Sequence, residues 1–262
     1  SFLQMRGIPL EGVMAKVWNK RIFKQIRTEA DAASRALAAE RGPCPDAEEF
    51  GIMERFYNKI AIAPTASISI ICGGASPGIE PIAANSFTHK TLSGSFAVRN
   101  KHLEALLAGY GRNDEDTWTS ITLNEGSVQH LDFLSDEEKD VFKTAFELDQ
   151  RWLIELAGDR TPFVCQSQSL NIFLPGDVHK RDLHRLHLLA WKKGVKSLYY
   201  CRSKSIQRAE SSATETARVS AAALALAQAS GQAIPLLGKI NGHEKANGKA
   251  AEVDYEECLA CQ

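Results

Sequence analysis

The chain has 262 residues, of which 44% are hydrophobic and 24% are charged, with a formal net charge of −1 at pH 7. This composition predicts a soluble globular protein of one or two domains, and the near-zero charge gives no reason to expect nucleic acid or a membrane as a partner. Apolar runs fall short of the roughly 20 residues that span a bilayer, and six scattered cysteines favour a reducing, cytoplasmic environment over a disulfide scaffold.

The first predicted element is a long helix over residues 11–40, where apolar residues recur at helical spacing. Gly42-Pro43 is expected to end it. Residues 59–63 predict a short strand that runs into a Pro-Thr-Ala-Ser segment at 64–67, and a glycine-rich turn follows at 73–78.

Further helices and strands alternate along the chain. A short amphipathic helix is expected around Leu103, Leu106, Leu107 and Tyr110. A capping box that starts at Ser135 predicts a helix to about residue 158. Residues 163–173 and 195–200 predict strands, and a helix over residues 178–193 between them ends with Gly194 as its C′ residue.

This alternation predicts an α/β fold with a largely parallel sheet. We expect residues 1–205 to form the folded part. Residues 206–262 are rich in Ser, Ala, Gly and Lys, a composition typical of a flexible tail.

Small hydroxyl residues follow the first predicted strand, at residues 62–69. If a helix begins there, its free N–H groups and the hydroxyls of Thr65, Ser67 and Ser69 favour a phosphate group. A capped helix start without any ligand explains the same residues, so this segment by itself leaves both interpretations open.

Two tyrosines, Tyr199 and Tyr200, are adjacent in a predicted strand. Neighbouring side chains of a strand point to opposite faces, so one core and one surface aromatic residue is the simpler interpretation. The alternative is a pair of oxidisable phenols in a radical relay.

Cys258 and Cys261 form a Cys-x-x-C pair next to the C-terminus. Two thiols at this spacing can act as a redox dithiol, because one thiolate attacks and the other resolves. The alternatives are incidental cysteines and half of a zinc site, since zinc takes four ligands and only His243 is available in the tail as a third.

Residues 166–171, Gln-Ser-Gln-Ser-Leu-Asn, are rich in amide and hydroxyl groups. Inside a barrel these side chains would need hydrogen-bond partners, whereas on an edge strand they would face water. Two further groups are expected to have no catalytic role. They are the solvated or packing histidines His179, His184 and His187, and the small buried cysteines Cys72, Cys165 and Cys201.

Taken in order, six motifs resemble the large catalytic subunit of class I ribonucleotide reductase. They occupy residues 63–67, 78–81, 92–96, 149–150, 166–171 and 194–200. The terminal cysteine pair fits the same family, and the resemblance extends from residue 1 to about residue 205. Six ordered motifs are far more specific than any one of them.

The resemblance implies a radical reduction of ribonucleoside diphosphates to deoxyribonucleotides, with disulfide formation. It implies that Tyr199 and Tyr200 carry the radical from a small subunit. Cys258 and Cys261 would re-reduce an active-site disulfide and then be reduced by thioredoxin or glutaredoxin. The residues that would hold the phosphates of the ribonucleotide substrate are Pro64, Thr65, Ala66, Ser67 and Ile68.

The sequence also departs from the family pattern. The family's clustered Asn, radical Cys and Glu have no match here, nor do its two active-site disulfide cysteines, and Cys165 stands where an acidic residue is expected. We therefore expect the C-terminal half of a ten-stranded α/β barrel, followed by the tail and active only with an N-terminal half of the catalytic subunit.

The resemblance further implies that a metal-containing small subunit supplies the radical and that this chain binds no cofactor or metal. The competing hypothesis is a catalytically inactive phosphate- or partner-binding module derived from the same fold.

Overall fold

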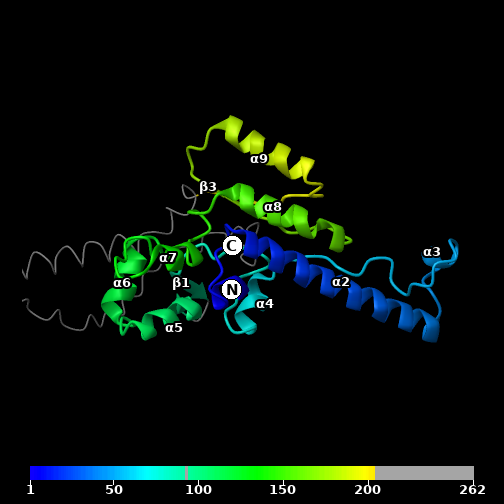
Figure 1. Cartoon of the computed structure of the whole chain (residues 1–262), viewed down its shortest axis with the longest axis horizontal. Coiled ribbons are helices and arrows are strands. Elements are labelled where there is room, and N and C mark those ends of the chain that lie inside the picture. Colours follow the sequence, from blue (N-terminus) through cyan, green and yellow to red (C-terminus); the bar gives the residue numbers. More distant parts are fainter. Residues whose placement is uncertain (92–93, 204–262) are drawn as a thin grey trace, which may run out of the picture. The chain divides into compact units, whose positions relative to one another are not determined.

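Helix α2, Val13–Arg41, is the longest element in the part of the chain that the computed structural model describes, residues 1–91 and 94–203 (Figure 1). It ends at Gly42, whose φ of 82° is a positive value that favours glycine. The predicted helix over 11–40 and its end at Gly42-Pro43 are confirmed. Two short helices flank it, α1, Phe2–Met5, and α3, Pro45–Glu48.

Three extended segments run parallel to one another. Strand β3, Ile172–Leu174, pairs with strand β4, Cys201–Ser203, in the register Ile172↔Cys201. A parallel bridge joins Ile62 to Gln168. Residues 167 and 169 bond to the Ile62 segment and residues 170 and 172 bond to the 199–200 segment. Because alternate residues of a strand bond to opposite sides, the segment 166–174 lies between the other two.

Of the strands predicted over 59–63, 163–173 and 195–200, the first two are confirmed only in part and the bounds of the third are wrong, because strand β4 starts at residue 201. Among the described residues, regular pairing covers the shorter strands β3 and β4, and the first segment contributes only its bridge at Ile62. Strand β4 starts only after the range predicted for the last segment, because the pairing is interrupted at Tyr199 and Tyr200.

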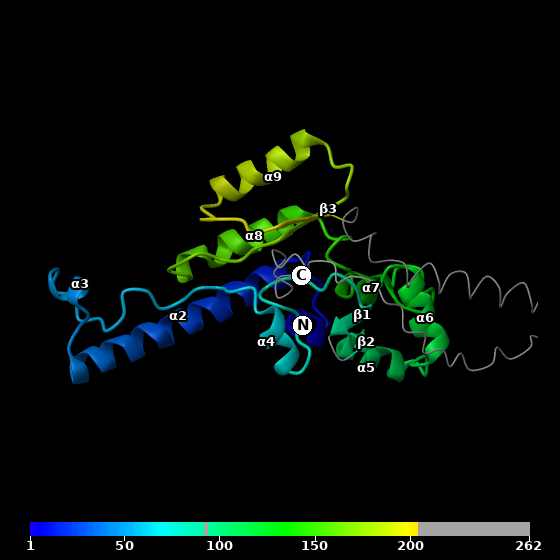
Figure 2. The same cartoon turned by 180° about the vertical axis from the view of Figure 1, so that it is seen from behind.

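Helix α8, Gln150–Arg160, packs against α2 on one side and against α9, Lys180–Lys192, on the other (Figures 1 and 2). The helix predicted over 178–193 is confirmed, and Gly194 after it has a φ of 71°. A hydrophobic core fills the space between α8, α9 and β3, formed by Ala145, Leu153, Ile154, Ala157, Leu170, Phe173 and Ala190.

A second core follows, in the chain, an antiparallel hairpin that the sequence patterns did not predict. Its strands are β1, Ser86–Thr91, and β2, Gly94–Arg99. The predicted amphipathic helix is confirmed as α5, Lys101–Gly109, and a further helix, α6, Glu115–Leu123, lies next to it in the chain. The core residues are Leu103, Leu107, Trp118, Ile121, Val128, Leu131, Leu134, Val141 and Phe142.

The helix predicted from Ser135 to about residue 158 is wrong as one element. The capping box at Ser135 is present and opens helix α7, Asp136–Val141. The chain then leaves the helix, because Phe142 is buried in the second core and Ala145 in the first. Helix α8 starts anew with Asp149 as N-cap, whose carboxylate accepts from the Arg151 N–H at 3.0 Å.

Helices and parallel strand segments are thus combined, which confirms the predicted α/β class. The expected parallel sheet is accompanied by the antiparallel hairpin. Of the helices in residues 1–91 and 94–203, none is both long enough and apolar enough to cross a membrane.

Candidate functional site

The predicted phosphate loop leads into helix α4, Ala66–Ile71, and Thr65 is its N-cap residue. The Thr65 hydroxyl makes no capping bond to this helix. Instead, Thr65 Oγ1 accepts a hydrogen bond of 2.6 Å from the Gly78 N–H. The helix start is therefore confirmed, but the threonine ties the loop to the Gly-Ile-Glu-Pro segment at 78–81.

Gly78 is needed at this contact for two reasons. Its φ is +58°, in the left-handed region, and a Cβ atom there would lie 3.3 Å from the carbonyl oxygens of both Ala63 and Pro64. Thr65 itself has a φ of 53°. The turns at Thr65 and Gly78 thus meet closely, which holds the loop in one shape.

The other hydroxyls of the loop divide into two roles. Ser69 is buried, and its Oγ donates to the Ala66 carbonyl at 2.7 Å while its carbonyl accepts from Gly74 and Ala75. Ser69 therefore stabilises the helix and the glycine-rich turn. Ser67 and Ile68 are exposed, so the first turn of α4 faces solvent.

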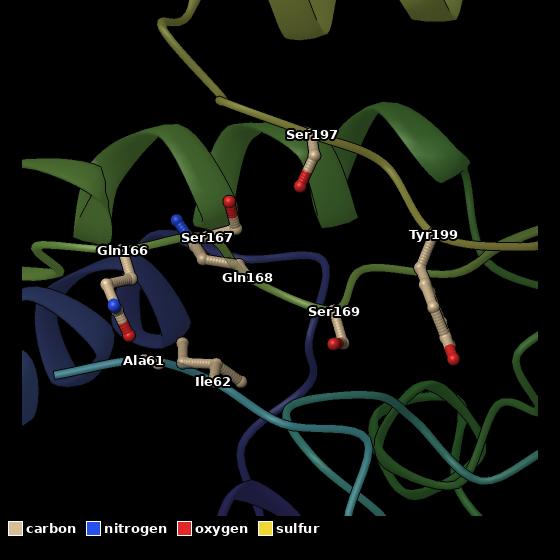
Figure 3. Close-up of a pocket in the computed structure, with 8 residues that line it drawn as sticks. All are labelled: Ala61, Ile62, Gln166, Ser167, Gln168, Ser169, Ser197 and Tyr199. Carbon is tan, nitrogen blue, oxygen red and sulfur yellow. The ribbon is translucent and has the colours of Figure 1, made fainter.

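A cavity of about 430 Å³ lies between the 60–62 segment and the 197–199 segment (Figure 3). Its wall thus includes both the segment that precedes the phosphate loop and the first tyrosine of the pair. Hydroxyl and amide side chains form much of its wall. The lining residues are Ala61, Ile62, Gln166, Ser167, Gln168, Ser169, Ser197 and Tyr199.

Gln168 anchors the amide-rich segment to helix α8. Its Oε1 accepts from Arg160 Nε at 2.6 Å, and its Nε2 donates to the Ala157 carbonyl at 3.1 Å and to Thr161 Oγ1 at 3.0 Å. Arg160 also donates to Asn19 Oδ1, and burial lowers the pKa of this arginine to about 9. The expected need for hydrogen-bond partners is confirmed for the buried Gln168, whereas Gln166 and Ser167 of the same segment are exposed. The edge-strand alternative is wrong, because the segment lies between two others.

The backbone at the tyrosine pair contains a β-bulge. Tyr199 N–H donates to the Leu170 carbonyl at 2.9 Å, and Ile172 N–H donates to the Tyr200 carbonyl at 2.9 Å. In a regular parallel ladder one residue would make both bonds, through its own N–H and its own carbonyl. Here two residues share them, so the tyrosine segment carries one extra residue.

The bulge places the two phenol rings together. The ring centroids of Tyr199 and Tyr200 are 4.2 Å apart with an interplanar angle of 53°. The two residues are 44% and 43% exposed, respectively. The expectation of opposite faces, with one core and one surface ring, is therefore wrong, since a bulge breaks the alternation of a regular strand. The Arg202 guanidinium lies 5.8 Å from the centroid of the Tyr200 ring.

The predicted small buried cysteines are not buried. Cys72 and Cys201 are exposed, and Cys165 is half-buried. Cys165 Sγ accepts from the Lys59 N–H at 3.4 Å and from Arg27 at 3.6 Å. Desolvation raises the pKa of this thiol, but the N–H donors and the Arg27 charge outweigh it, so the net pKa is lowered. Sequence patterns missed this cluster because its members are far apart in the chain.

The three histidines of helix α9 and its N-cap are exposed, as predicted. His179 Nδ1 caps the helix by accepting from the Arg181 N–H, and His187 Nδ1 lies 2.8 Å from the Leu183 carbonyl oxygen. Within residues 1–91 and 94–203, no group of three potential metal ligands gathers. The predicted dithiol, Cys258 and Cys261, lies outside the described residues, as does His243.

Comparison with known proteins gives a consistent result. The model of the family described as "Ribonucleotide reductase, barrel domain" matches residues 46–201. The ribonucleoside-diphosphate reductase large subunit of Invertebrate iridescent virus 6 is 46% identical over 214 residues, which are 80% of this chain and 22% of that protein. The large subunit of Danio rerio is 31% identical, over 78% of this chain and 29% of that protein.

A solved structure agrees with these relatives. The Actinobacillus ureae class Id ribonucleotide reductase alpha subunit matches with a TM-score of 0.70 and 37% identity, over 77% of this chain and 36% of that chain. The chain thus spans about a fifth to a third of the length of the proteins it matches. Because the family model covers more than half of the sequence, this chain belongs to the ribonucleotide reductase barrel-domain family.

Proposed function

We propose that this chain is part of a ribonucleoside-diphosphate reductase large subunit, which reduces ribonucleotides to deoxyribonucleotides by radical chemistry. Membership of the barrel-domain family supports the proposal. The single observation that carries it is the contact between the rings of Tyr199 and Tyr200 at a centroid distance of 4.2 Å. Such a contact is of no evident use to the core, because both residues are more than two-fifths exposed.

The tyrosine pair acts as a relay in this proposal. A phenol that loses one electron and one proton becomes a neutral radical, and a neighbouring phenol can then return both. Two rings in contact make each transfer short. Tyr199 and Tyr200 would thus pass the radical from a metal-containing small subunit toward a cysteine that this sequence does not contain.

The loop formed by Pro64, Thr65, Ala66, Ser67 and Ile68 binds the substrate phosphates in this proposal. Helix geometry leaves the first N–H groups of α4 without an intrahelical acceptor. The exposed Ser67 adds a hydroxyl donor. Thr65 and Gly78 hold the loop from behind through their 2.6 Å hydrogen bond, so the N–H groups keep their direction.

The dithiol supplies the electrons. Replacing a ribose hydroxyl by hydrogen releases water and needs two electrons and two protons, which two thiols provide when they form a disulfide. Cys258 and Cys261 would reduce that disulfide by thiol–disulfide exchange and become a disulfide themselves. Thioredoxin or glutaredoxin would then reduce the pair again.

The remaining partners follow from the same proposal. An N-terminal half of the catalytic subunit would supply the radical cysteine and the rest of a ten-stranded barrel. The parallel segments at 60–62, 166–174 and 199–203 would be the part of that barrel contributed here, and the predicted tail, residues 206–262, lies outside the described residues. The metal belongs to the small subunit, and this chain binds none.

The relay is tested by Tyr199→Phe in a complex of the chain with an N-terminal half and a small subunit. Phenylalanine has no phenol to oxidise, so we expect turnover to fall to background while the complex still assembles. Tyr57→Phe, which alters an exposed tyrosine outside the pair, should leave turnover unchanged. Normal turnover of Tyr199→Phe would exclude the relay.

Calorimetry separates the proposal from the binding-module hypothesis. The isolated chain titrated with ribonucleoside diphosphates should show no binding at micromolar concentrations until the N-terminal half is added. Micromolar binding by the chain alone would favour a self-sufficient module.

The dithiol is tested by Cys258→Ser in the same complex. We expect this variant to reduce ribonucleotides with a small dithiol reductant but not with thioredoxin. An equal loss of turnover with both reductants would argue against a shuttle.

A further inference from the structure

The bulge at the tyrosine pair leaves one backbone N–H without an acceptor in the strand ladder, and a side-chain oxygen accepts its hydrogen bond instead. The Tyr200 N–H donates to Asn171 Oδ1 at 3.0 Å. Asn171 is only 5% exposed, so water cannot easily replace this acceptor. The bulge therefore depends on an amide oxygen in this position, because a backbone N–H that faces the buried Asn171 without an acceptor is costly.

Glu80 determines which way the Asn171 amide points. One carboxylate oxygen of Glu80 accepts from the Asn171 backbone N–H at 2.9 Å, and the other accepts from Asn171 Nδ2 at 3.1 Å. With Nδ2 held by the carboxylate, Oδ1 must face the tyrosine segment. The reversed amide would place an NH₂ group against the Tyr200 N–H, donor against donor.

Glu80 also belongs to the segment that supports the phosphate loop. It follows Gly78 by two residues, and the Gly78 N–H donates to Thr65 Oγ1 at 2.6 Å. A series of hydrogen bonds, interrupted only by the single residue between Gly78 and Glu80, thus connects the loop to the second tyrosine. Burial raises the pKa of Glu80, whereas the Asn171 donors and the Arg202 charge act in the opposite direction.

We propose that Asn171 and Glu80 are positioning residues for the tyrosine pair: Asn171 holds the bulge that brings the two rings together, and Glu80 orients Asn171 and links it to the phosphate loop. The proposal rests on the proposed function for its effect on turnover. Its structural part, the dependence of the ring contact on the Glu80–Asn171 pair, stands independently of any activity.

The test exchanges the two functional groups. In Glu80→Gln an amide NH₂ faces Asn171 Nδ2, and in Asn171→Asp a second carboxylate faces Glu80, so each single variant breaks the pairing. In the double variant Glu80→Gln/Asn171→Asp, the new amide at position 80 can donate to one oxygen of the new carboxylate at position 171, while the other oxygen accepts from Tyr200. The net charge of the double variant equals that of the original chain.

The first readout needs no catalysis. Nuclear Overhauser contacts between the Tyr199 and Tyr200 rings are measured in the full chain with isotope-labelled tyrosine. We expect the contacts to be lost in both single variants and restored in the double variant. Glu104→Gln, which makes the same change on the exposed face of α5, should keep them.

The second readout is turnover in the assembled complex. We expect kcat to fall by about ten- to a hundredfold in each single variant, because small displacements of reacting groups have effects of this size. The double variant should regain most of the original kcat. Absence of turnover in the unmodified complex, with ring contacts that respond as expected, would reject the proposed function and keep the positioning role.

Two results would overturn the proposal. One is an unchanged ring contact in both single variants. The other is a double variant whose loss of ring contact and of kcat equals the combined losses of the two single variants. If both single variants fail to fold in urea-unfolding measurements, a folded double variant with the original ring contact still supports the pairing, and an unfolded double variant rejects it.

Discussion

Backbone angles at two residues decide the shape of the candidate phosphate loop. Thr65 and Gly78 both have positive φ values, 53° and 58°. A non-glycine residue at such an angle costs about 1–2 kcal/mol, and the Thr65 hydroxyl offsets part of this through its bond to Gly78. The loop therefore depends on a glycine at position 78 and a short hydroxyl side chain at position 65.

Gly78→Ala should destabilise the chain more than an ordinary glycine substitution. The new methyl group would lie 3.3 Å from two carbonyl oxygens, those of Ala63 and Pro64. Gly111→Ala is the matched control, since Gly111 has a similar φ of +65° with no atom within 4 Å of the added Cβ. We expect urea unfolding to show a loss about 1 kcal/mol larger for Gly78→Ala. Equal losses of unfolding free energy in the two variants would mean that the loop can move to accommodate the methyl group without cost.

Cys165 offers a test of charge at the same scale. Its thiol pKa is lowered in the folded chain, so the thiolate forms at a lower pH than in an ordinary cysteine. Alkylation of Cys165 by iodoacetamide, followed by peptide mass spectrometry, should therefore have its midpoint below that of the unfolded chain. Arg27→Gln should raise this midpoint, because it removes a cation 3.6 Å from the sulfur. If the midpoint is unchanged, the lowered pKa of Cys165 is due to the backbone N–H donors alone.

The linkage has a definite sign. Between the folded and the unfolded pKa of the Cys165 thiol, the unfolded chain holds the proton and the folded chain does not. The contribution of this group to stability therefore increases with pH in that window and is lost as the pH falls through the folded pKa.

Helix α8 illustrates how one element serves both packing and the candidate site. Its buried face joins the core, and its last residue, Arg160, supports the amide-rich segment through Gln168. Burial lowers the pKa of Arg160 to about 9, since the residue is only 4% exposed. The charge is costly, but the guanidinium satisfies the acceptors of Gln168 and Asn19.

Arg160→Met should destabilise the chain although it removes a buried charge. The substitution leaves Oε1 of the buried Gln168 without its donor, at a cost of about 1–3 kcal/mol, and it also removes the bond to Oδ1 of the half-buried Asn19. Arg151→Met on the same helix is the control, because its pair with Asp149 is exposed, and we expect only a small change. Thermal unfolding of both variants decides. A more stable Arg160→Met would mean that desolvation of the charge exceeds the value of its bonds.

At the scale of the whole chain, apolar surface remains on the outside of the described part. Val13, Met14 and Val17 occupy the first turns of α2 and are 50% to 73% exposed. The extended segment at Ile62 bonds to one neighbouring segment, and strand edges with apolar neighbours favour association with other chains. These features suit a part of a larger barrel.

The isolated chain should therefore associate with itself. Light scattering is expected to give a mass well above the 28.8 kDa of one chain. Val13→Glu/Val17→Glu should lower that mass, whereas Ala32→Glu/Ala39→Glu, with the same charge change at exposed positions of α2, should not. A well-behaved monomer of the unmodified chain would contradict the half-barrel model.

Much of the fold and the family could be predicted from the sequence, because the signals are local. The end of α2 at Gly42, the capping box at Ser135 and the helix before Gly194 each depend on residues within one or two turns. The order of the short motifs identified the family for the same reason. The role of the dithiol, Cys258 and Cys261, stays a prediction, since both residues lie outside the described part.

By itself, then, the sequence determined the helices α2, α5 and α9, the family and the candidate site residues. Only the tertiary structure decided the break between α7 and α8, which arises because two separate cores compete for residues 142 and 145. It also decided the contact between Tyr199 and Tyr200, which requires a bulge against a strand some thirty residues earlier, held by Asn171. Such features depend on pairings between distant segments, and no pattern of neighbouring residues records them.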